Sequence, residues 1–303
     1  VYSVWRSNVA TVRINLGYEN ARYIGSQNYK LVKESGTAYL QDDTTYTVGS
    51  TYSMPSFDDL YLEGMYVSSY DYAGRTYNRP SSITISSETV EISVNWAGAC
   101  AYIKDYYSTG FHKYYASLDM ALQDALKDNS PNAASHSTSE VGAVVLVQPN
   151  ETTLTISQTL NILEGQKLTI SLYSNDVTIY RASGLNGNLF NVSGSLVLSG
   201  GDLNSLTFAE QNSSKAKDVL ISVSGGGNVE IKNNVVFSGI TNSSTQYGSV
   251  IYALHANVNI DNVAFNNCKN TYSAGQAMGG AIYADSSIVT IDYATFTGCS
   301  VMG

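Results

Sequence analysis

The sequence is poor in cysteine, histidine, proline and positive charge, and these shortages exclude several classes of protein. Its three cysteines and three histidines match no zinc-binding spacing. Sixteen Lys and Arg against 25 Asp and Glu give a net charge of −9, which disfavours the basic surfaces that nucleic acids and anionic membranes attract. Apolar runs such as 142–147 are far shorter than the roughly 18 residues of a membrane-spanning segment. We therefore expect no nucleic-acid partner, no membrane insertion, no metal and no cofactor.

Tyrosine and glycine, in contrast, are abundant, with 24 and 25 residues against only four prolines. Together with many Val, Ile and Thr residues they favour a globular protein rich in β-strands. Most tyrosines lie at or before Tyr115, and this change in composition indicates a domain boundary. We expect a small Tyr-rich β domain at residues 1–100 and a linker at 101–113.

The C-terminal part of the chain contains an internal repeat. Residues 248–268 recur without a gap as residues 279–299. Strand-like positions align in three sets: Val229, Val258 and Val289; Ile231, Ile260 and Ile291; Phe237, Phe265 and Phe296. Polar residues alternate with these apolar ones, as expected for stacked coils whose apolar side chains point inward. The repeat predicts a parallel solenoid over residues 140–303.

One amphipathic helix is predicted at residues 114–131, before the solenoid. Leucine and alanine recur at helical spacing, Ser117 can cap the start, and Pro131 ends the segment. The first coil of a solenoid would otherwise expose its core, so we expect the helix to cover it.

The solenoid resembles the right-handed parallel β-helix proteins of the pectin-lyase-like group. Its Gly279-Gly280-Ala281-Ile282 element is similar to the repeat of bacterial surface adhesins and polymorphic outer-membrane proteins. Their frequent Phe-x-x-Asn motif is not reproduced, because Phe265 and Phe296 lead to cysteines. The resemblance implies an all-β fold: a right-handed parallel β-helix, capped by one α-helix and preceded by the small Tyr-rich domain.

The N-terminal region resembles the β-grasp-like modules of bacterial surface proteins, of the mucin-binding type. The features that carry this resemblance are a Tyr-x-Val-Gly-x-x-Tyr-x-x-Pro pattern at 46–55 and a last strand that ends on Trp96. At the other end of the chain, Met302-Gly303 repeats Met278-Gly279, from which we expect that further coils follow.

Tyrosines are the candidate binding residues. Tyr66, Tyr70, Tyr72 and Tyr77 fall in a polar stretch that we expect to be an exposed loop, as in many carbohydrate- and protein-binding surfaces. Tyr252 and Tyr283 occupy equivalent positions and should form a two-step aromatic ladder. The alternative is that these rings only pack within the fold.

Cys268 and Cys299 also occupy equivalent positions on adjacent coils, about 4.8 Å apart in a parallel stack. That separation suits either a disulfide or a buried pair of thiols. His255 aligns with Ser286 and is expected to be an exposed strand residue.

Catalytic chemistry is not expected. Arg181 has no acidic cluster near it in sequence, and Asp261 and Asp292 lie at equivalent positions rather than facing each other as hydrolase carboxylates do. The likeliest function from sequence is a non-catalytic extracellular adhesin or stalk on a cell surface, binding a glycan or protein ligand. The alternatives are the front portion of a polysaccharide lyase or hydrolase, and a surface-layer or filament subunit that self-associates through an open solenoid end.

Overall fold

The computed structural model describes residues 8–108, 111–128, 143–146, 153–211 and 217–302. The chain divides into two compact units, Val1–Ala99 and Cys100–Gly303. Each unit has its own cluster of buried apolar side chains. Most described residues lie in strands, so the all-β class predicted from the sequence is confirmed.

The first unit is a six-stranded mixed sheet with short flanking strand pairs. Its elements are β1 (Val9–Asn15), β2 (Arg22–Tyr23), β3 (Tyr29–Glu34), β4 (Thr37–Thr47), β5 (Thr51–Ser53), the 3₁₀ helix η1 (Phe57–Asp59), β6 (Leu60–Tyr61), β7 (Met65–Tyr72), β8 (Arg75–Tyr77), β9 (Ser82–Thr84) and β10 (Thr89–Gly98). The sheet order is β3-β4-β1-β10-β7-β8, and the central strands β1 and β10 are parallel. Alternate residues of both strands, such as Val12 and Ile92, are buried because side chains point to opposite faces in turn.

The second unit begins with an antiparallel hairpin where a linker was expected. Its strands are β11 (Ala101–Ser108) and β12 (Phe111–Tyr115), and β11 also pairs with β13 (Ala143–Leu146). The expectation of a linker at 101–113 is therefore wrong. Residues such as Ala101 and Ile103 alternate into the core of this unit, which a solvent-exposed linker would not do.

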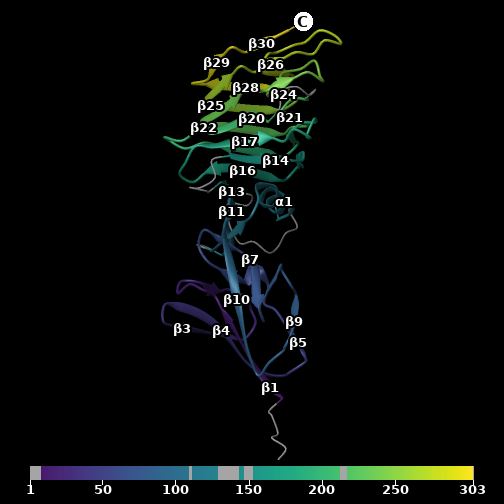
Figure 1. Ribbon diagram of the computed structural model, residues 1–303. Helices are drawn as coiled ribbons and strands as arrows, with labels where there is room; N and C mark the ends of the chain where they lie inside the picture. The colour runs from purple at the N-terminus through teal and green to yellow at the C-terminus, as the bar shows by residue number, and fades with distance from the viewer. Residues whose placement is uncertain (1–7, 109–110, 129–142, 147–152, 212–216, 303) are drawn as a thin grey trace, which may run out of the picture. The chain divides into compact units, whose positions relative to one another are not determined.

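The rest of this unit is a parallel β-solenoid of about 5 turns (Figure 1). The largest sheet adds to β11, β12 and β13 the strands β14 (Thr153–Ile156), β16 (Lys167–Leu172), β17 (Val177–Arg181), β19 (Ser195–Ser199), β20 (Leu206–Glu210), β22 (Asn228–Ser238), β25 (Asn257–Asn266), β28 (Ile288–Asp292) and β29 (Thr295–Thr297). A second sheet contains β15 (Leu160–Ile162), β18 (Phe190–Val192), β21 (Ile221–Ser224), β24 (Ile251–Leu254) and β27 (Ile282–Asp285). A third contains β23 (Thr241–Asn242), β26 (Lys269–Asn270) and β30 (Ser300–Val301).

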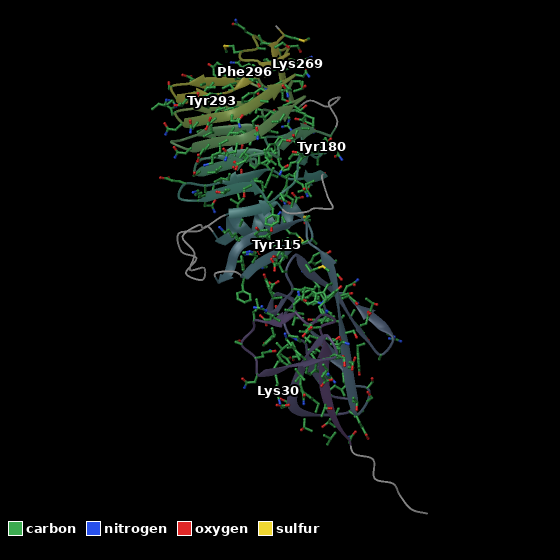
Figure 2. The ribbon with its side chains drawn as sticks, turned by 90° about the vertical axis from the view of Figure 1, so that its left-hand side faces the viewer. Lys30, Tyr115, Tyr180, Lys269, Tyr293 and Phe296 are labelled. Carbon is green, nitrogen blue, oxygen red and sulfur yellow. The ribbon has the colours of Figure 1, made fainter. Side chains whose placement is uncertain are left out.

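The register of the coils matches the alignment made from the repeat. Val229, Val258 and Val289 pair in succession, as do the isoleucine and phenylalanine sets. The phenylalanines form a column in the core, with ring centroids 5.7 Å apart for Phe208–Phe237, 5.2 Å for Phe237–Phe265 and 4.7 Å for Phe265–Phe296. Figure 2 labels Phe296 on the last described coil. The prediction that equivalent apolar residues stack inside the solenoid is confirmed.

Coil corners are set by residues in the left-handed region of backbone space. One corner is formed by Asn234, Asn262 and Tyr293, with φ of 60°, 56° and 49°. Asparagine adopts this conformation more readily than most residues, so it is suited to repeated sharp turns. His255, with φ of 51°, lies at another corner. It is exposed as predicted, but it is not a strand residue, because the chain turns there.

The repeated glycines before β24 and β27 have a steric cause. Gly248 and Gly279 have φ of 54° and 72°, and a Cβ on either would lie 2.5 or 2.3 Å from the carbonyl oxygen of Ile251 or Ile282. No side chain fits so close to a backbone oxygen. The glycine of the Gly-x-x-Ile spacing therefore allows the backbone to turn tightly just before β24 and β27.

Helix α1 (Leu118–Asp128) lies beside the first strands of the solenoid (Figure 1). Leu118, Leu122 and Ala125 are buried in the core that continues into the coils. The backbone N–H of Met120 donates to Ser117 Oγ (3.3 Å), so the predicted cap is present. The helix starts later than the predicted residue 114, because Tyr114 and Tyr115 pair with β11 in the hairpin. The predicted residues 129–131 lie outside the described part of the chain.

Candidate functional site

The tyrosines expected in an exposed N-terminal loop lie instead in the β7–β8 hairpin. Tyr70 and Tyr72 are buried in the core of the first unit, and Tyr77 packs against it. The Tyr72 hydroxyl is hydrogen-bonded to Ser86 Oγ (2.6 Å), and the Tyr70 hydroxyl donates to the Pro55 carbonyl (3.4 Å). The expectation of an exposed binding loop is therefore wrong for Tyr70 and Tyr72. Tyr66 is half-buried and remains outside this core.

A β-bulge in β7 turns Tyr70 and Tyr72 into the core. The register between β7 and β10 shifts between Ser69 and Val67, which leaves Ser68 as an extra residue. A bulge of one residue moves the following side chains to the other face of the sheet. Tyr70 and Tyr72 are thereby directed inward together with Val67, although simple alternation would place them with Tyr66.

Tyr252 and Tyr283 are brought together on adjacent coils, as predicted, and a third ring joins them. Tyr247 stacks on both, with ring centroids 5.2 Å from Tyr252 and 4.5 Å from Tyr283, while the latter two are 6.0 Å apart. All three side chains are half-buried. Burial first, and then the neighbouring Tyr247 and Tyr283, raise the pKa of Tyr252. The Tyr252 hydroxyl is therefore protonated and uncharged at neutral pH.

Tyr247 was not identified from the sequence, because it lies one residue before the aligned repeat and its equivalent on the next coil, with which it forms a parallel β-bridge, is Met278 rather than an aromatic residue. Its segment is held by two buried asparagines on adjacent coils. Asn242 Nδ2 donates to the carbonyls of Tyr247 (3.1 Å) and Gly248 (2.6 Å), and Asn270 Nδ2 donates to that of Gln246 (2.9 Å). Buried amides with several acceptors fix the backbone on both sides of the ring. The tyrosine cluster is thus preorganised.

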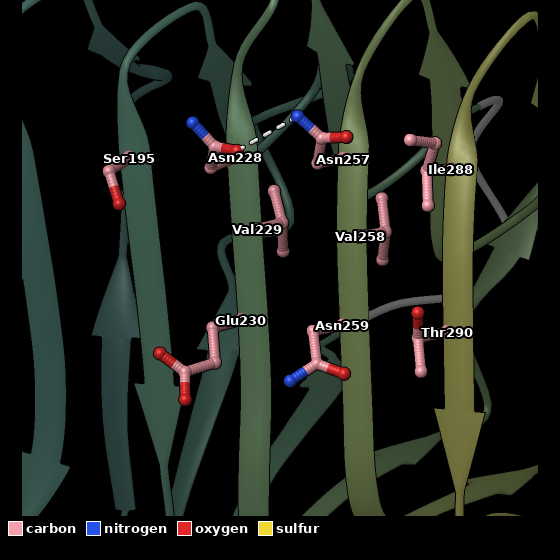
Figure 3. Close-up of a pocket in the computed structure, with 9 residues that line it drawn as sticks. All are labelled: Ser195, Asn228, Val229, Glu230, Asn257, Val258, Asn259, Ile288 and Thr290. Atoms are coloured by element: carbon pink, nitrogen blue, oxygen red, sulfur yellow. Dashed lines mark hydrogen bonds between the residues drawn. The ribbon is translucent and has the colours of Figure 1, made fainter.

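The outer face of the largest sheet carries a shallow groove of about 280 Å³ (Figure 3). Its polar lining comes from β19, β22, β25 and β28: Ser195, Asn228, Glu230, Asn257, Asn259 and Thr290, with Ile288 at one end. Asn257 Nδ2 donates to Asn228 Oδ1 (3.1 Å), the dashed line in Figure 3. Lys232 forms an ion pair with Glu230 (2.7 Å), and both side chains are exposed. Much of the hydrogen-bonding capacity of this groove is used within it.

The two stacked cysteines are free thiols in the structure. Cys268 Sγ donates to the Phe237 carbonyl (3.6 Å), and Cys299 Sγ donates to the equivalent Phe265 carbonyl (3.2 Å). Burial and the neighbouring Cys299 raise the pKa of Cys268 to about 12. Equivalent side chains on stacked coils point in the same direction, and here each thiol bonds to the backbone of the preceding coil. The structure therefore has two free thiols rather than a disulfide, with Cys268 buried and Cys299 half-buried.

Arg181 has an acidic partner that sequence proximity did not reveal. The fully buried guanidinium pairs with Glu210 on the next coil, with Nε donating to Oε2 (3.1 Å). Next to it, buried Lys217 donates from Nζ to the carbonyls of Ala182 (3.1 Å) and Leu185 (2.6 Å). The sequence did contain a signal for this pair, because Arg181 and Glu210 are one coil length apart and therefore occupy equivalent positions on adjacent coils. Both cations stabilise the segment at 182–187.

Acidic residues of the solenoid do not converge on a common point. Asp261 and Asp292 pair in register along one outer row, as the repeat predicted. In the part of the chain that the structure describes, no group of three or more His, Cys, Asp or Glu side chains could hold a metal ion. The described helices include none that is long and apolar enough to cross a membrane.

Comparison of the chain with protein-family models, with curated proteins and with solved structures finds no match. The geometry of the chain itself therefore carries the functional argument.

Proposed function

We propose that the chain is a non-catalytic extracellular adhesin or stalk of a bacterial surface, whose solenoid presents a binding face to a glycan, a matrix protein or another cell. The observation that carries this proposal is the repetition of partly exposed polar and aromatic side chains, in register, on the outer faces of the coils. Such a face offers the same kind of contact again at each coil, about 4.8 Å further along the axis.

Rigidity supports the same proposal. The core is a continuous column of apolar side chains, and buried asparagines hold the segment that carries Tyr247. A preorganised surface loses little conformational entropy when a ligand binds, so many weak contacts can add to useful affinity. Binding of this kind needs no converging catalytic groups.

The finer family assignment is also part of the proposal. An adhesin of the pectin-lyase-like group would have a parallel solenoid with a Gly-Gly-Ala-Ile element before a strand. The tight turn at Gly279 explains why this element needs a glycine. For the first unit, the parallel central pair β1 and β10 supports the β-grasp-like, mucin-binding resemblance. Both assignments place the protein outside the cell.

A binding array of glycans and matrix proteins tests the function, with release of reducing sugars and unsaturated products measured in the same samples. We expect binding to at least one class of ligand and no product. Product release would instead support the first alternative, the front portion of a polysaccharide lyase or hydrolase.

Self-assembly into a filament or surface layer is the second alternative. Sedimentation velocity over a range of protein concentrations distinguishes the two cases. An adhesin or stalk sediments as one species, while a filament or surface-layer subunit forms larger species as concentration rises.

A further inference from the structure

The second sheet of the solenoid carries a row of outward residues that runs across all five of its strands. The row consists of Asn161, Asn191, Ser222, Tyr252 and Tyr283, paired in register from β15 to β27. Their neighbours along the inner strands, such as Phe190 and Ile221, are buried in the core. Four steps of one strand spacing give the row a length of about 19 Å. It is therefore a straight line of amide, hydroxyl and aromatic groups without a charged member.

At its first end the row opens into a shallow, open cavity of about 350 Å³ between α1 and the first coil. The lining comes from both elements: Gln123, Leu126, Lys127, Gln158, Thr159, Leu160, Asn161 and Gln166. The side-chain amides of Gln123 and Gln158 make no hydrogen bond to any group that the structure describes. This volume is at the lower end of the range of small-molecule sites. The cavity therefore places the side-chain amides of Gln123 and Gln158 next to the apolar side chains of Leu126 and Leu160.

The amides of the row are aligned with one another. Asn188 Nδ2 donates to Asn191 Oδ1 (2.8 Å), and Asn191 Nδ2 donates to Asn161 Oδ1 (2.9 Å). This chain fixes both amides, and among the described groups the Nδ2 of Asn161 has no acceptor. It is therefore available to a ligand at the mouth of the cavity. At the far end, the cluster of Tyr247, Tyr252 and Tyr283 provides the aromatic surface.

We infer that this row is a binding track for a linear, uncharged oligosaccharide that runs from the cavity beside α1 to the three-tyrosine cluster. Hydroxyl groups of sugars match fixed amides, which donate and accept, and the C–H faces of sugar rings match aromatic side chains. The length of the track accommodates about four sugar rings at one ring per step between neighbouring strands. This inference rests on the proposed function and names its ligand class and its site.

A peptide ligand fits this surface less well. Strands β18, β21 and β24 are each paired on both sides, so their backbone groups are already hydrogen-bonded within the sheet. Recognition of an extended peptide by strand addition needs an unpaired sheet edge. The groove of Figure 3 is the competing surface for a sugar, but its Asn228 and Asn257 amides bond to each other, its Glu230 pairs with Lys232, and its described lining contains no aromatic ring.

Titration calorimetry with linear cello-, manno-, xylo- and chito-oligosaccharides, from disaccharide to hexasaccharide, tests the inference on the full chain. We expect affinity for at least one series to rise with length and to level off at about four rings. Tyr252→Ala and Gln158→Ala should each weaken binding about tenfold, which corresponds to the loss of one good contact. Tyr252→Phe keeps the ring and should bind like the original chain, which separates loss of the aromatic face from misfolding.

Asn259→Ala, in the groove of Figure 3, is the matched control and should leave affinity unchanged. Binding that is lost in Asn259→Ala but retained in Tyr252→Ala and Gln158→Ala would place the ligand in the groove, which overturns the track and leaves the proposed function intact. Binding of charged but not uncharged saccharides would also overturn the track. If neither glycans nor matrix proteins bind, both the binding track and the proposed function are wrong.

Discussion

Arg181 is the only arginine between Cys100 and Gly303, and its side chain is fully buried. Besides Glu210 it has two backbone acceptors, the carbonyls of Gly187 (3.1 Å) and Asp218 (2.9 Å). A charge removed from water remains favourable only when its hydrogen bonds are made inside the protein. The pair therefore joins two coils and also fixes the segment between β17 and β18.

Removing one member of this pair should be far more harmful than removing both. Glu210→Gln leaves a buried guanidinium without its counter-charge, and we expect a loss of about 3–5 kcal/mol in the free energy of unfolding. The double variant Arg181→Met, Glu210→Met should lose clearly less, because no buried charge is left unpaired. Urea unfolding followed by circular dichroism measures both. Equal losses in the single and double variants would contradict the assigned coupling.

Asp124 on α1 connects the capping helix to the β11–β12 hairpin. Lys113 Nζ (2.8 Å) and the Tyr115 hydroxyl (2.6 Å) donate to its carboxylate. Burial alone would raise the pKa of Asp124, but these two hydrogen bonds and the charges of Lys113 and Lys127 lower it. The ionised carboxylate is thus favoured in the folded state.

A pH dependence of stability follows from this lowered pKa. Its contribution is fully present above the unfolded value near 4 and is lost as the pH falls through the lower folded value. We expect Asp124→Asn to lose about 1 kcal/mol at pH 7 relative to the original chain, with the difference vanishing in acid. Thermal unfolding from pH 7 to pH 2 measures this. A difference that grows in acid would have the wrong sign.

At the residue scale, prediction from sequence succeeded where a residue belongs to the repeat and failed where its environment depends on a local irregularity. Tyr252 and Tyr283 were placed together because equivalent positions stack in any solenoid. Tyr70 and Tyr72 were misplaced because their polar segment was expected to be an exposed loop, whereas it forms a hairpin in which a bulge turns both rings inward. Tyr247 was missed because its equivalent on the next coil is Met278 rather than an aromatic residue.

At the scale of elements, the phenylalanine column is a continuous stack of aromatic rings that runs from coil to coil. Phe237 is fully buried between Phe208 and Phe265, and its ring is stacked on both. Close packing leaves little room for relaxation, so a truncated side chain leaves a cavity.

Phe237→Ala should therefore lower the free energy of unfolding by about 3–5 kcal/mol. Phe237→Leu retains most of the apolar volume and should cost clearly less. Chemical denaturation of both variants is the measurement. A loss below about 1 kcal/mol for Phe237→Ala would contradict a closely packed column at this coil.

The glycine before β24 allows a second test, with a matched control in the same unit. Gly248 and Gly225 both have positive φ, but a Cβ meets the Ile251 carbonyl oxygen at 2.5 Å only in Gly248. We expect Gly225→Ala to cost about 1 kcal/mol from backbone strain. Gly248→Ala adds a clash with the backbone and should cost about 3 kcal/mol or more. Equal melting temperatures for the two variants would refute this explanation of the repeated glycine.

Strands and helices with a periodic sequence pattern were predicted well. Strands that depend on pairing with distant parts of the chain were predicted less well. The coils follow from the repeat because each copy buries its neighbour, and the helix follows from its apolar stripe and the Ser117 cap. The β11–β12 hairpin was missed, since its strands contain Asp105, Lys104 and several tyrosines rather than a clear alternation. Their pairing with β13 is a tertiary contact that the local sequence does not reveal.

At the scale of the whole molecule, the solenoid unit combines a rigid repeated core with outer faces that differ from one another. One face bears the polar groove, and another bears the row from Asn161 to Tyr283. The fold was predictable, because it depends on the repeated inner residues. The site was only partly predictable, because Gln123 and Gln158 belong to the cap and to a turn, which do not repeat, and because Tyr247 has Met278 at its equivalent position on the next coil.

We propose that the chain binds an extracellular ligand and leaves it chemically unchanged. Prolonged incubation with the tightest-binding oligosaccharide from the array, followed by mass spectrometry of the recovered sugar, tests both parts of this proposal. We expect a stable complex from which the oligosaccharide is recovered whole and unmodified. Recovery of shorter or unsaturated fragments would contradict it and identify the chain as a catalytic protein.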